Sequence, residues 1–282
     1  MKLSAAEIRA AVKQALAEDI GRGDATTLAM VPAQLQVHAV MRARESLTVA
    51  GIGFAEEAFR QLSRRVRVEK MAVDGEHAAR GKVLLKISGP AQAILTAERV
   101  ALNFVQRLSG VATLTARFVH EVKETRAKIL DTRKTTPGWR SFEKYAVTCG
   151  GGRNHRFGLF DMVLIKDNHL AALREEKPNA IAAAVRQARK KYPQLQVEVE
   201  ADNLAQVAQA VDAGADIILL DNMDLKRMRV AVKIINRRAK IEASGGVTLK
   251  TASAIAMTGV DFISVGALTH SARAVDIGLD FE

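Results

Sequence analysis

Apolar and polar positions repeat with two different periods over the first hundred residues. Ser4 and Glu7 have the spacing of a helix capping box. The apolar positions that follow are helically spaced: Ile8, Val12, Leu16 and Ile20. Residues 34–44 alternate with a period of two, which predicts a strand with one solvent-facing side. This part of the chain therefore mixes helices with strands.

The rest of the first hundred residues continues this α+β pattern. It predicts a helix over 53–64 and short strands over 66–70 and 83–87. A long helix is expected from Pro90 to Leu108, with Gly110 ending it.

After Gly110 the pattern changes to short apolar runs that end in a polar residue, with helical patterns between them. The runs are KILDT (128–132), MVLIK (162–166), QVEVE (196–200), DIILLD (216–221), KIEA (240–243) and DFISV (261–265). Such runs are typical of parallel strands buried on both faces in strand–helix units. Either a β/α barrel or a doubly wound sheet would fit. We favour the barrel, because six consecutive units lack a dinucleotide-binding fingerprint.

The composition is that of a globular protein with an excess of basic residues, which favours the binding of anions. The chain has 42 Lys and Arg against 31 Asp and Glu, a formal charge of +11, and such a surplus favours anionic partners. Aromatic residues make up only 4%, which is poor material for stacking on nucleic-acid bases. The single cysteine, Cys149, allows no internal disulfide, and no segment has the length and apolarity of a membrane span. We therefore expect a soluble, cytoplasmic protein.

Candidate chemistry gathers where the predicted parallel strands end, since active sites of such folds lie there. A single charged residue at a strand end is commonly a solvated loop residue. Here polar residues recur at the ends of several strands, and this recurrence indicates a site. The strand-end residues are Asp131, Arg133, Lys134, Lys166, Glu200, Asp221, Ser244, Gly245, Gly246 and Gly266. The glycine turns at 244–246 and 265–267 suit backbone binding of a phosphate.

One segment combines glycines with cations in an unusual way. Gly150, Gly151 and Gly152 run directly into RNHR at 153–156, which indicates close backbone packing or ligand approach rather than a plain linker. Arg133 and Arg156 can bind carboxylates bidentately, whereas lysines act as point charges suited to phosphates. Carboxylates in such a cationic site would serve sugar hydroxyls, Mg²⁺ or a cationic sugar transition state.

Longer motifs resemble the quinolinate phosphoribosyltransferase family over nearly the whole chain. They are EDIGRGDAT (18–26), AERVALNFVQRLSGVATLT (97–115), DTRKTTPGWR (131–140), KYAVTCGGGRNHRFGLFDMVLIKDNH (144–169), LLDNM (219–223) and EASGGV (242–247). The resemblance implies an N-terminal α/β sandwich domain (1–110, joined by the tail 268–282) and an incomplete β/α barrel (111–267). It implies transfer of phosphoribosyl from phosphoribosyl pyrophosphate to quinolinate with decarboxylation, giving nicotinate mononucleotide. One departure is Trp139, where a smaller aliphatic residue is usual, and we expect local repacking around it.

The same resemblance implies a role for each matched residue. Quinolinate would be held by Thr132, Arg133, His155 and Arg156, with Arg99 donated by the partner subunit of a homodimer that could assemble into a hexamer. Lys134, Lys166, Glu200 and Asp221 would be catalytic, the two carboxylates also serving Mg²⁺. The 5′-phosphate would lie in the turns formed by Ser244, Gly245 and Gly246 and by Gly266 and Ala267.

Three other interpretations stay open. A paralogue of the same fold could act on nicotinate or serve molybdenum transport, although one carboxylate would not need so many cations. A nucleic-acid-binding protein would explain the basic surface but not Glu200 and Asp221. A structural role would leave the glycine and charge pattern unexplained. We expect neither nucleic acid nor a membrane as partner.

Overall fold

The computed structural model describes residues 1–282, which form two compact units. The first comprises Met1–Ala116, Thr136–Gly151 and Leu268–Glu282, and the second comprises Arg117–Thr135 and Gly152–Ala267. This division differs from the predicted one at residues 111–116 and 136–151, which group with the first unit rather than the barrel.

The first unit is built on an antiparallel sheet. Its strand order is β12–β1–β5–β3, with a separate β2–β4 pair. The strands are β1 (Gln36–Ala43), β2 (Leu47–Thr48), β3 (Arg67–Lys70), β4 (His77–Ala78), β5 (Val83–Pro90) and β12 (Ile277–Phe281). The helices are α1 (Ala5–Ile20), α2 (Ala25–Met30), α3 (Ile52–Leu62), α4 (Ala91–Glu121) and α5 (Arg140–Cys149). The capping box is confirmed: Glu7 N donates to Ser4 Oγ (3.2 Å) and Ser4 N donates to Glu7 Oε2 (2.9 Å).

Gly110 does not end its helix, contrary to the sequence prediction. Helix α4 continues through it to Glu121, and a Cβ at Gly110 would overlap the backbone carbonyl of Arg273. The absent side chain makes room for the C-terminal tail, which Gln106 also holds by donating to Ile277 O (2.7 Å). The glycine therefore serves a close approach between backbones rather than a helix terminus.

Helix α5 joins the first unit through buried polar contacts. Glu143 is fully buried and accepts hydrogen bonds from Arg107 Nη2 (2.8 Å) and Thr136 N (3.0 Å). Tyr145 donates its hydroxyl to Asp74 (2.6 Å). Trp139, immediately before the helix, stacks on Phe104 with ring centroids 5.1 Å apart. The larger side chain is thus accommodated in an aromatic cluster.

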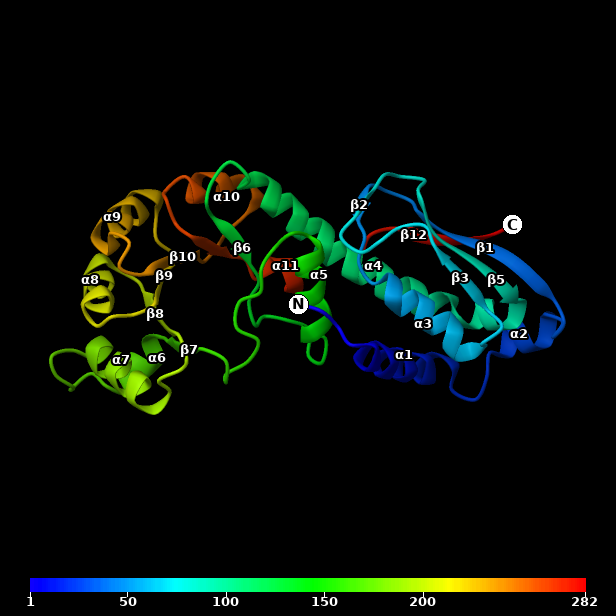
Figure 1. The fold of residues 1–282 in the computed structure, drawn as a ribbon, viewed down its shortest axis with the longest axis horizontal. Coiled ribbons are helices and arrows are strands. Elements are labelled where there is room, and N and C mark those ends of the chain that lie inside the picture. The colour runs from blue at the N-terminus through cyan, green and yellow to red at the C-terminus, as the bar shows by residue number, and fades with distance from the viewer. The chain divides into compact units, whose positions relative to one another are not determined.

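The second unit is a parallel six-stranded sheet in the order β6–β11–β10–β9–β8–β7. Its strands are β6 (Lys128–Leu130), β7 (Val163–Ile165), β8 (Val197–Ala201), β9 (Ile217–Asp221), β10 (Lys240–Ser244) and β11 (Phe262–Ser264). All six predicted strands are present. Because β6 and β7 lie at the two ends of the sheet, the barrel is incomplete, as expected (Figure 1).

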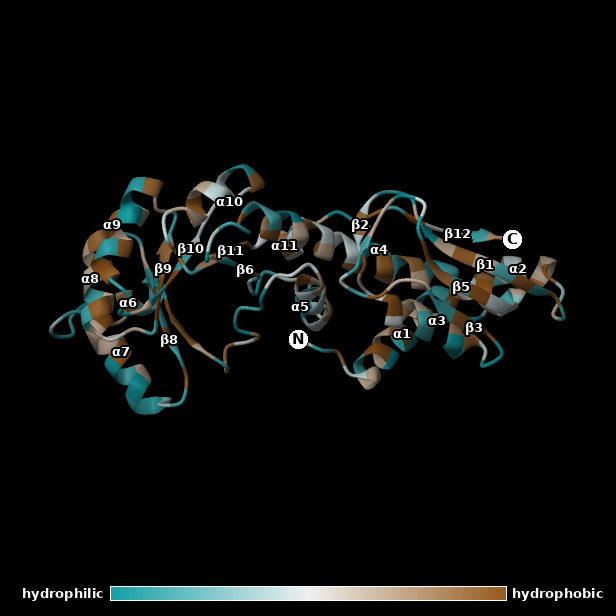
Figure 2. Cartoon of the chain, turned by 45° about the horizontal axis from the view of Figure 1, so that its top comes forward, coloured by the Kyte–Doolittle hydropathy of each residue, from teal (hydrophilic) through white to brown (hydrophobic).

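Helices between these strands complete the strand–helix units. They are α6 (Asp167–Ala171), α7 (Ala180–Lys191), α8 (Leu204–Asp212), α9 (Leu225–Ile235) and α10 (Leu249–Ala256), with α11 (Ala267–His270) after β11. Asn179, Asn203 and Asp224 cap α7, α8 and α9 with side-chain oxygens. Figure 2 shows both hydrophilic and hydrophobic residues on these helices, consistent with one face packed on the sheet and the other in water.

None of the helices has the length and apolarity needed to span a membrane.

Candidate functional site

The parallel sheet brings the predicted strand-end residues to one edge. Glu200 and Asp221 come from the ends of β8 and β9, and Ser244 pairs in register with Asp221 from β10. Lys166 follows β7, and Gly266 follows β11. Parallel strands end at the same edge, so these residues line one site.

A lysine and a glutamate form an ion pair at the ends of the neighbouring strands β7 and β8. Lys166 Nζ contacts Glu200 Oε2, and the side chains are 42% and 13% exposed. The lysine end of the pair is open to solvent, which limits what the pair contributes to stability. Its two charges are therefore available to a ligand that enters the site.

The glycine turn after β10 packs closely against the end of β9. Asn222 has a left-handed backbone (φ 50°) and donates Nδ2 to Asp221 Oδ2 (2.8 Å). Gly245 has φ +94°, and a Cβ there would lie 2.5 Å from Asn222 Cγ. Gly246, at φ +59°, has open space at the corresponding position. Only glycine lets this turn approach Asn222, which fixes the direction of Asp221.

Residues 131–134 form the loop after β6. Asp131 is buried, and Thr132 Oγ1 accepts a hydrogen bond from Lys134 N (3.0 Å). Arg133 is half-buried and Lys134 is exposed. The three predicted ligand-binding residues of this loop thus lie beside the other strand ends.

The glycine-rich segment continues the sheet beyond β6. Arg153 N donates to Ile129 O (2.8 Å), and Asp131 N donates to Arg153 O (3.1 Å). Asp131 then accepts from Asn154 Nδ2 (2.6 Å) and from His155 N (2.9 Å). A buried carboxylate therefore fixes the backbone that carries His155 and Arg156.

Two buried glutamates beneath the site were not predicted. Glu198 and Glu242 are 0% and 1% exposed, and Nε2 of His155 lies 3.0 Å from Glu198 Oε2 and 3.5 Å from Glu242 Oε2. Burial and the negative charge of Glu198 raise the pKa of Glu242. The signal was available: in QVEVE and KIEA an acidic residue stands where an apolar interior residue is usual.

Arg156 lies within the same buried group. Its backbone N donates to His155 Nδ1 (2.8 Å), and its Nη1 donates to Met162 O (3.2 Å). Burial lowers the pKa of Arg156 and the nearby Arg133 lowers it further, while Glu198 and Asp161 oppose the shift. Two arginines so close together suit a ligand with two negative groups.

Two sets of residues have the donor atoms for a metal ion. Glu200 and Asp221 offer carboxylate oxygens at the open strand ends, as Mg²⁺ prefers. His155, Glu198 and Glu242 place one nitrogen and two oxygens within 4.8 Å of one another. However, Nδ1 of His155 accepts the Arg156 N–H, so the neutral ring carries its proton on Nε2. The nitrogen that faces the glutamates is then a donor, which is unsuited to a metal.

Arg99 is not among the residues that this sheet brings together. It belongs to the first unit and is exposed on α4.

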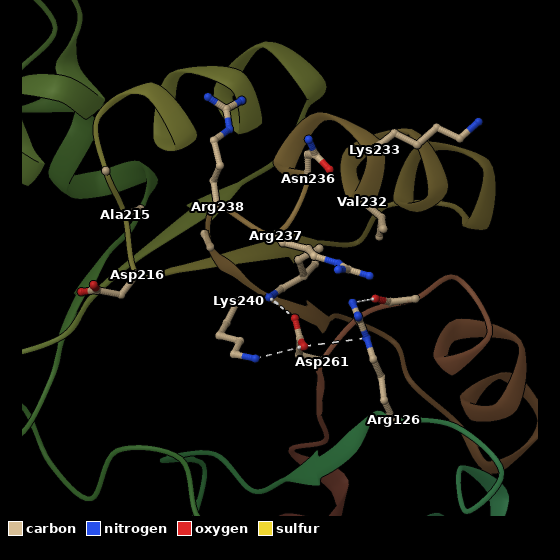
Figure 3. Close-up of a pocket in the computed structure, with 14 residues that line it drawn as sticks. Arg126, Ala215, Asp216, Val232, Lys233, Asn236, Arg237, Arg238, Lys240 and Asp261 are labelled. Atoms are coloured by element: carbon tan, nitrogen blue, oxygen red, sulfur yellow. Dashed lines mark hydrogen bonds and ion pairs between the residues drawn. The ribbon is translucent and has the colours of Figure 1, made fainter.

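A basic groove lies at the opposite edge of the sheet. It encloses about 910 Å³ and includes Lys240, the first residue of β10, and Asp216 and Asp261, which precede β9 and β11. Figure 3 shows Asp261 between Arg126 and Lys240, with which it pairs at 3.8 and 3.4 Å. Because the groove is at the amino ends of the strands, it is separate from the candidate site.

Comparison with known proteins gives a consistent result over the whole chain. The family models for the quinolinate phosphoribosyl transferase N-terminal and C-terminal domains match residues 24–109 and 111–280. A Mycobacterium leprae protein named nicotinate-nucleotide pyrophosphorylase (carboxylating) is 45% identical, over 96% of each chain. A chloroplastic Arabidopsis thaliana protein of that name is 43% identical, over 98% of this chain and 83% of its own. The solved structure of the Francisella tularensis nicotinate-nucleotide pyrophosphorylase superposes with a TM-score of 0.93 at 40% identity, covering 100% of this chain and 98% of that one.

Proposed function

The chain belongs to the quinolinate phosphoribosyl transferase family, and we propose that it is a pentosyltransferase of NAD biosynthesis. It joins quinolinate to the ribose of phosphoribosyl pyrophosphate and releases pyrophosphate and CO₂, leaving nicotinate mononucleotide. The observation that carries this proposal is the cationic edge of one parallel sheet. Arg133, Lys134, Arg156 and Lys166 lie there together with carboxylates suited to a sugar.

The two substrates would occupy different parts of this edge. The loop residues Thr132 and Arg133 and the segment with His155 and Arg156 form the acceptor subsite for the two quinolinate carboxylates. Planar guanidinium groups match such carboxylates in bidentate fashion.

The donor would lie across the remaining strand ends. Lys134 and Lys166 face its pyrophosphate. Its 5′-phosphate is held by backbone N–H groups of two turns, formed by Ser244, Gly245 and Gly246 and by Gly266 and Ala267.

Charge placement is the main catalytic contribution in this arrangement. As the bond from ribose to pyrophosphate breaks, positive charge develops on the sugar, and Glu200 and Asp221 stabilise it. The lysines stabilise the leaving pyrophosphate. The pyridine nitrogen then bonds to the anomeric carbon. When the 2-carboxylate departs as CO₂, its electron pair stays on ring carbon 2, where the adjacent ring cation stabilises it, and that carbon then takes a proton from water. No step requires a general base.

Mg²⁺ is the cofactor that the donor set favours. Glu200 and Asp221 would hold it, directly or through water and pyrophosphate, because hard divalent cations take oxygen ligands. When bound, it would supply positive charge to the pyrophosphate.

We further propose a homodimer in which Arg99 of one subunit completes the acceptor subsite of the other. Both units expose large apolar side chains, which commonly mark protein interfaces. Leu28 and Met30 are 62% and 78% exposed on α2, and Leu159 and Phe160 are each 73% exposed beside the acceptor segment. Light scattering distinguishes monomer, dimer and hexamer. Mixing inactive Arg99→Ala with inactive Lys166→Ala subunits should restore activity only if Arg99 acts in trans.

The proposed location is the cytoplasm, on the basis of the single cysteine, Cys149.

An end-point assay tests the activity. Quinolinate, phosphoribosyl pyrophosphate and Mg²⁺ should give CO₂ and nicotinate mononucleotide, whereas nicotinate in parallel should give none. Arg133→Ala and Lys166→Ala should abolish product, and exposed Arg174→Ala serves as the matched control. A folded wild type that makes no product from quinolinate contradicts the proposal.

A further inference from the structure

The interior of the sheet carries a second row of acidic residues beneath the strand ends. Side chains two apart on a strand share a face, so Glu198 lies below Glu200, and Glu242 lies below Ser244. Both glutamates are buried, and none of their carboxylate oxygens has a hydrogen-bond partner of good geometry. Burying such charges costs free energy unless opposite charges or hydrogen-bond donors lie nearby.

His155 faces both glutamates, and Arg156 lies near enough to Glu198 to feel its charge. Ser264 also lies close enough to stabilise the charged form of Glu242. The imidazole of His155 is engaged on both sides, with Nδ1 bound to Arg156 N and Nε2 directed at Glu198 and Glu242. The ring therefore links the two glutamates to the backbone of Arg156.

The charges of these side chains also link the glutamates to Arg156. The half-buried Arg133 and Arg156 repel each other, and Glu198 supplies opposite charge to Arg156. A cavity of about 380 Å³ lined by His155, Arg156 and Glu242 lies within this group. Without the glutamates, two arginines would have to be held together with less opposite charge nearby.

We propose that Glu198 and Glu242 are positioning residues for the acceptor: they hold His155, and through it Arg156, in place for the quinolinate carboxylates. This inference rests on the proposed function and deepens its acceptor subsite. Such a role concerns the binding of the dicarboxylate substrate, whereas the donor subsite, built on other residues, is independent of it.

Charge and shape can be separated at Glu198. Glu198→Gln keeps the shape and removes the charge, whereas Glu198→Asp keeps the charge on a shorter side chain. We expect Glu198→Gln to raise the Kd and KM for quinolinate about tenfold or more, the factor that corresponds to about 1.4 kcal/mol. The Kd for phosphoribosyl pyrophosphate and the kcat at saturation should change less than about twofold, well inside that factor. Glu198→Asp should retain more quinolinate affinity than Glu198→Gln, and exposed Glu175→Gln should match wild type.

The tautomer of His155 gives a readout that does not depend on turnover. In ¹⁵N NMR of the free protein, with the signal assigned by its loss in His155→Gln, the ring should carry its proton on Nε2. A proton on Nδ1 overturns the inference, because Nδ1 could then not accept the Arg156 N–H that links the ring to Arg156.

The kinetic outcomes are equally decisive. Unchanged quinolinate affinity in Glu198→Gln, or equal loss for both substrates, overturns the positioning role while leaving the proposed function intact. A wild type without turnover overturns the proposed function, and the positioning role with it.

Discussion

Replacing Gly245 with alanine separates backbone strain from a collision in the donor subsite. Gly245 has φ +94°, a conformation that costs an L-residue about 1–2 kcal/mol. The new Cβ would also lie 2.5 Å from Asn222 Cγ, so Asn222 must move and its bond to Asp221 is lost. A hydrogen bond to a charged group contributes about 1.5–3 kcal/mol, or roughly ten- to a hundredfold in affinity.

Two other glycines provide matched controls. Gly246 (φ +59°) and Gly214 (φ +76°) have open space where a Cβ would lie, so alanine there adds strain alone. Gly246→Ala and Gly214→Ala should therefore lower the free energy of unfolding by about 1–2 kcal/mol in urea titrations, and Gly245→Ala should lower it by at least as much. Calorimetry with Mg²⁺ should show weaker binding of phosphoribosyl pyrophosphate in Gly245→Ala, by about tenfold or more relative to Gly214→Ala.

Quinolinate affinity decides whether the effect is local. It should be nearly equal in the three variants, because the acceptor subsite is built on other loops. If Gly245→Ala and Gly214→Ala bind phosphoribosyl pyrophosphate equally well, the reasoning that Asn222 directs Asp221 is refuted.

Three further predictions concern the first unit. Burial and Asp74 raise the pKa of Cys149 to about 12, so at pH 8 only about one thiol in 10⁴ is ionised; iodoacetamide should label it far faster in urea than in the native protein, and Cys149→Ser should stay active. Glu143→Gln removes a buried charge that Arg107 and Thr136 bind, so it should cost about 3 kcal/mol of unfolding free energy in urea, and wild-type stability would contradict this. Hydrogen bonds from Arg273 and Asp276 N lower the pKa of Glu45 from 4.5 to about 2. Ionised Glu45 therefore stabilises the folded protein fully above about pH 4.5, and this stabilisation is lost as the pH falls toward 2. Hydrogen exchange at β12 should accelerate over that range in wild type and be nearly insensitive to it in Glu45→Gln.

The parallel sheet was predictable because its strands are buried on both faces. Continuous apolar runs such as DIILLD give a signal that does not depend on distant contacts. The polar residue that ends each run, such as Glu200 or Asp221, then locates the site. The antiparallel strand β12 was harder to predict, because its pairing with β1 joins residues far apart in the sequence.

The errors have physical causes. Gly110 was interpreted from its own conformational preference, whereas its role is to admit the backbone of Arg273. The segment 136–151 was assigned to the barrel on the family resemblance, whereas Glu143 and Tyr145 bind partners in the first unit. Glu198 and Glu242 were passed over because a strand-end search looks only at the last residue of each run.

The bridge between Leu130 and Arg153 has a consequence for solubility and for folding. In an incomplete barrel the outer side of β6 would otherwise be an unpaired sheet edge, which invites pairing with other chains. The segment that carries His155 and Arg156 covers that edge. Substitutions that loosen it, for example at Asp131 or Asn154, should therefore increase aggregation during expression as well as weaken the acceptor subsite.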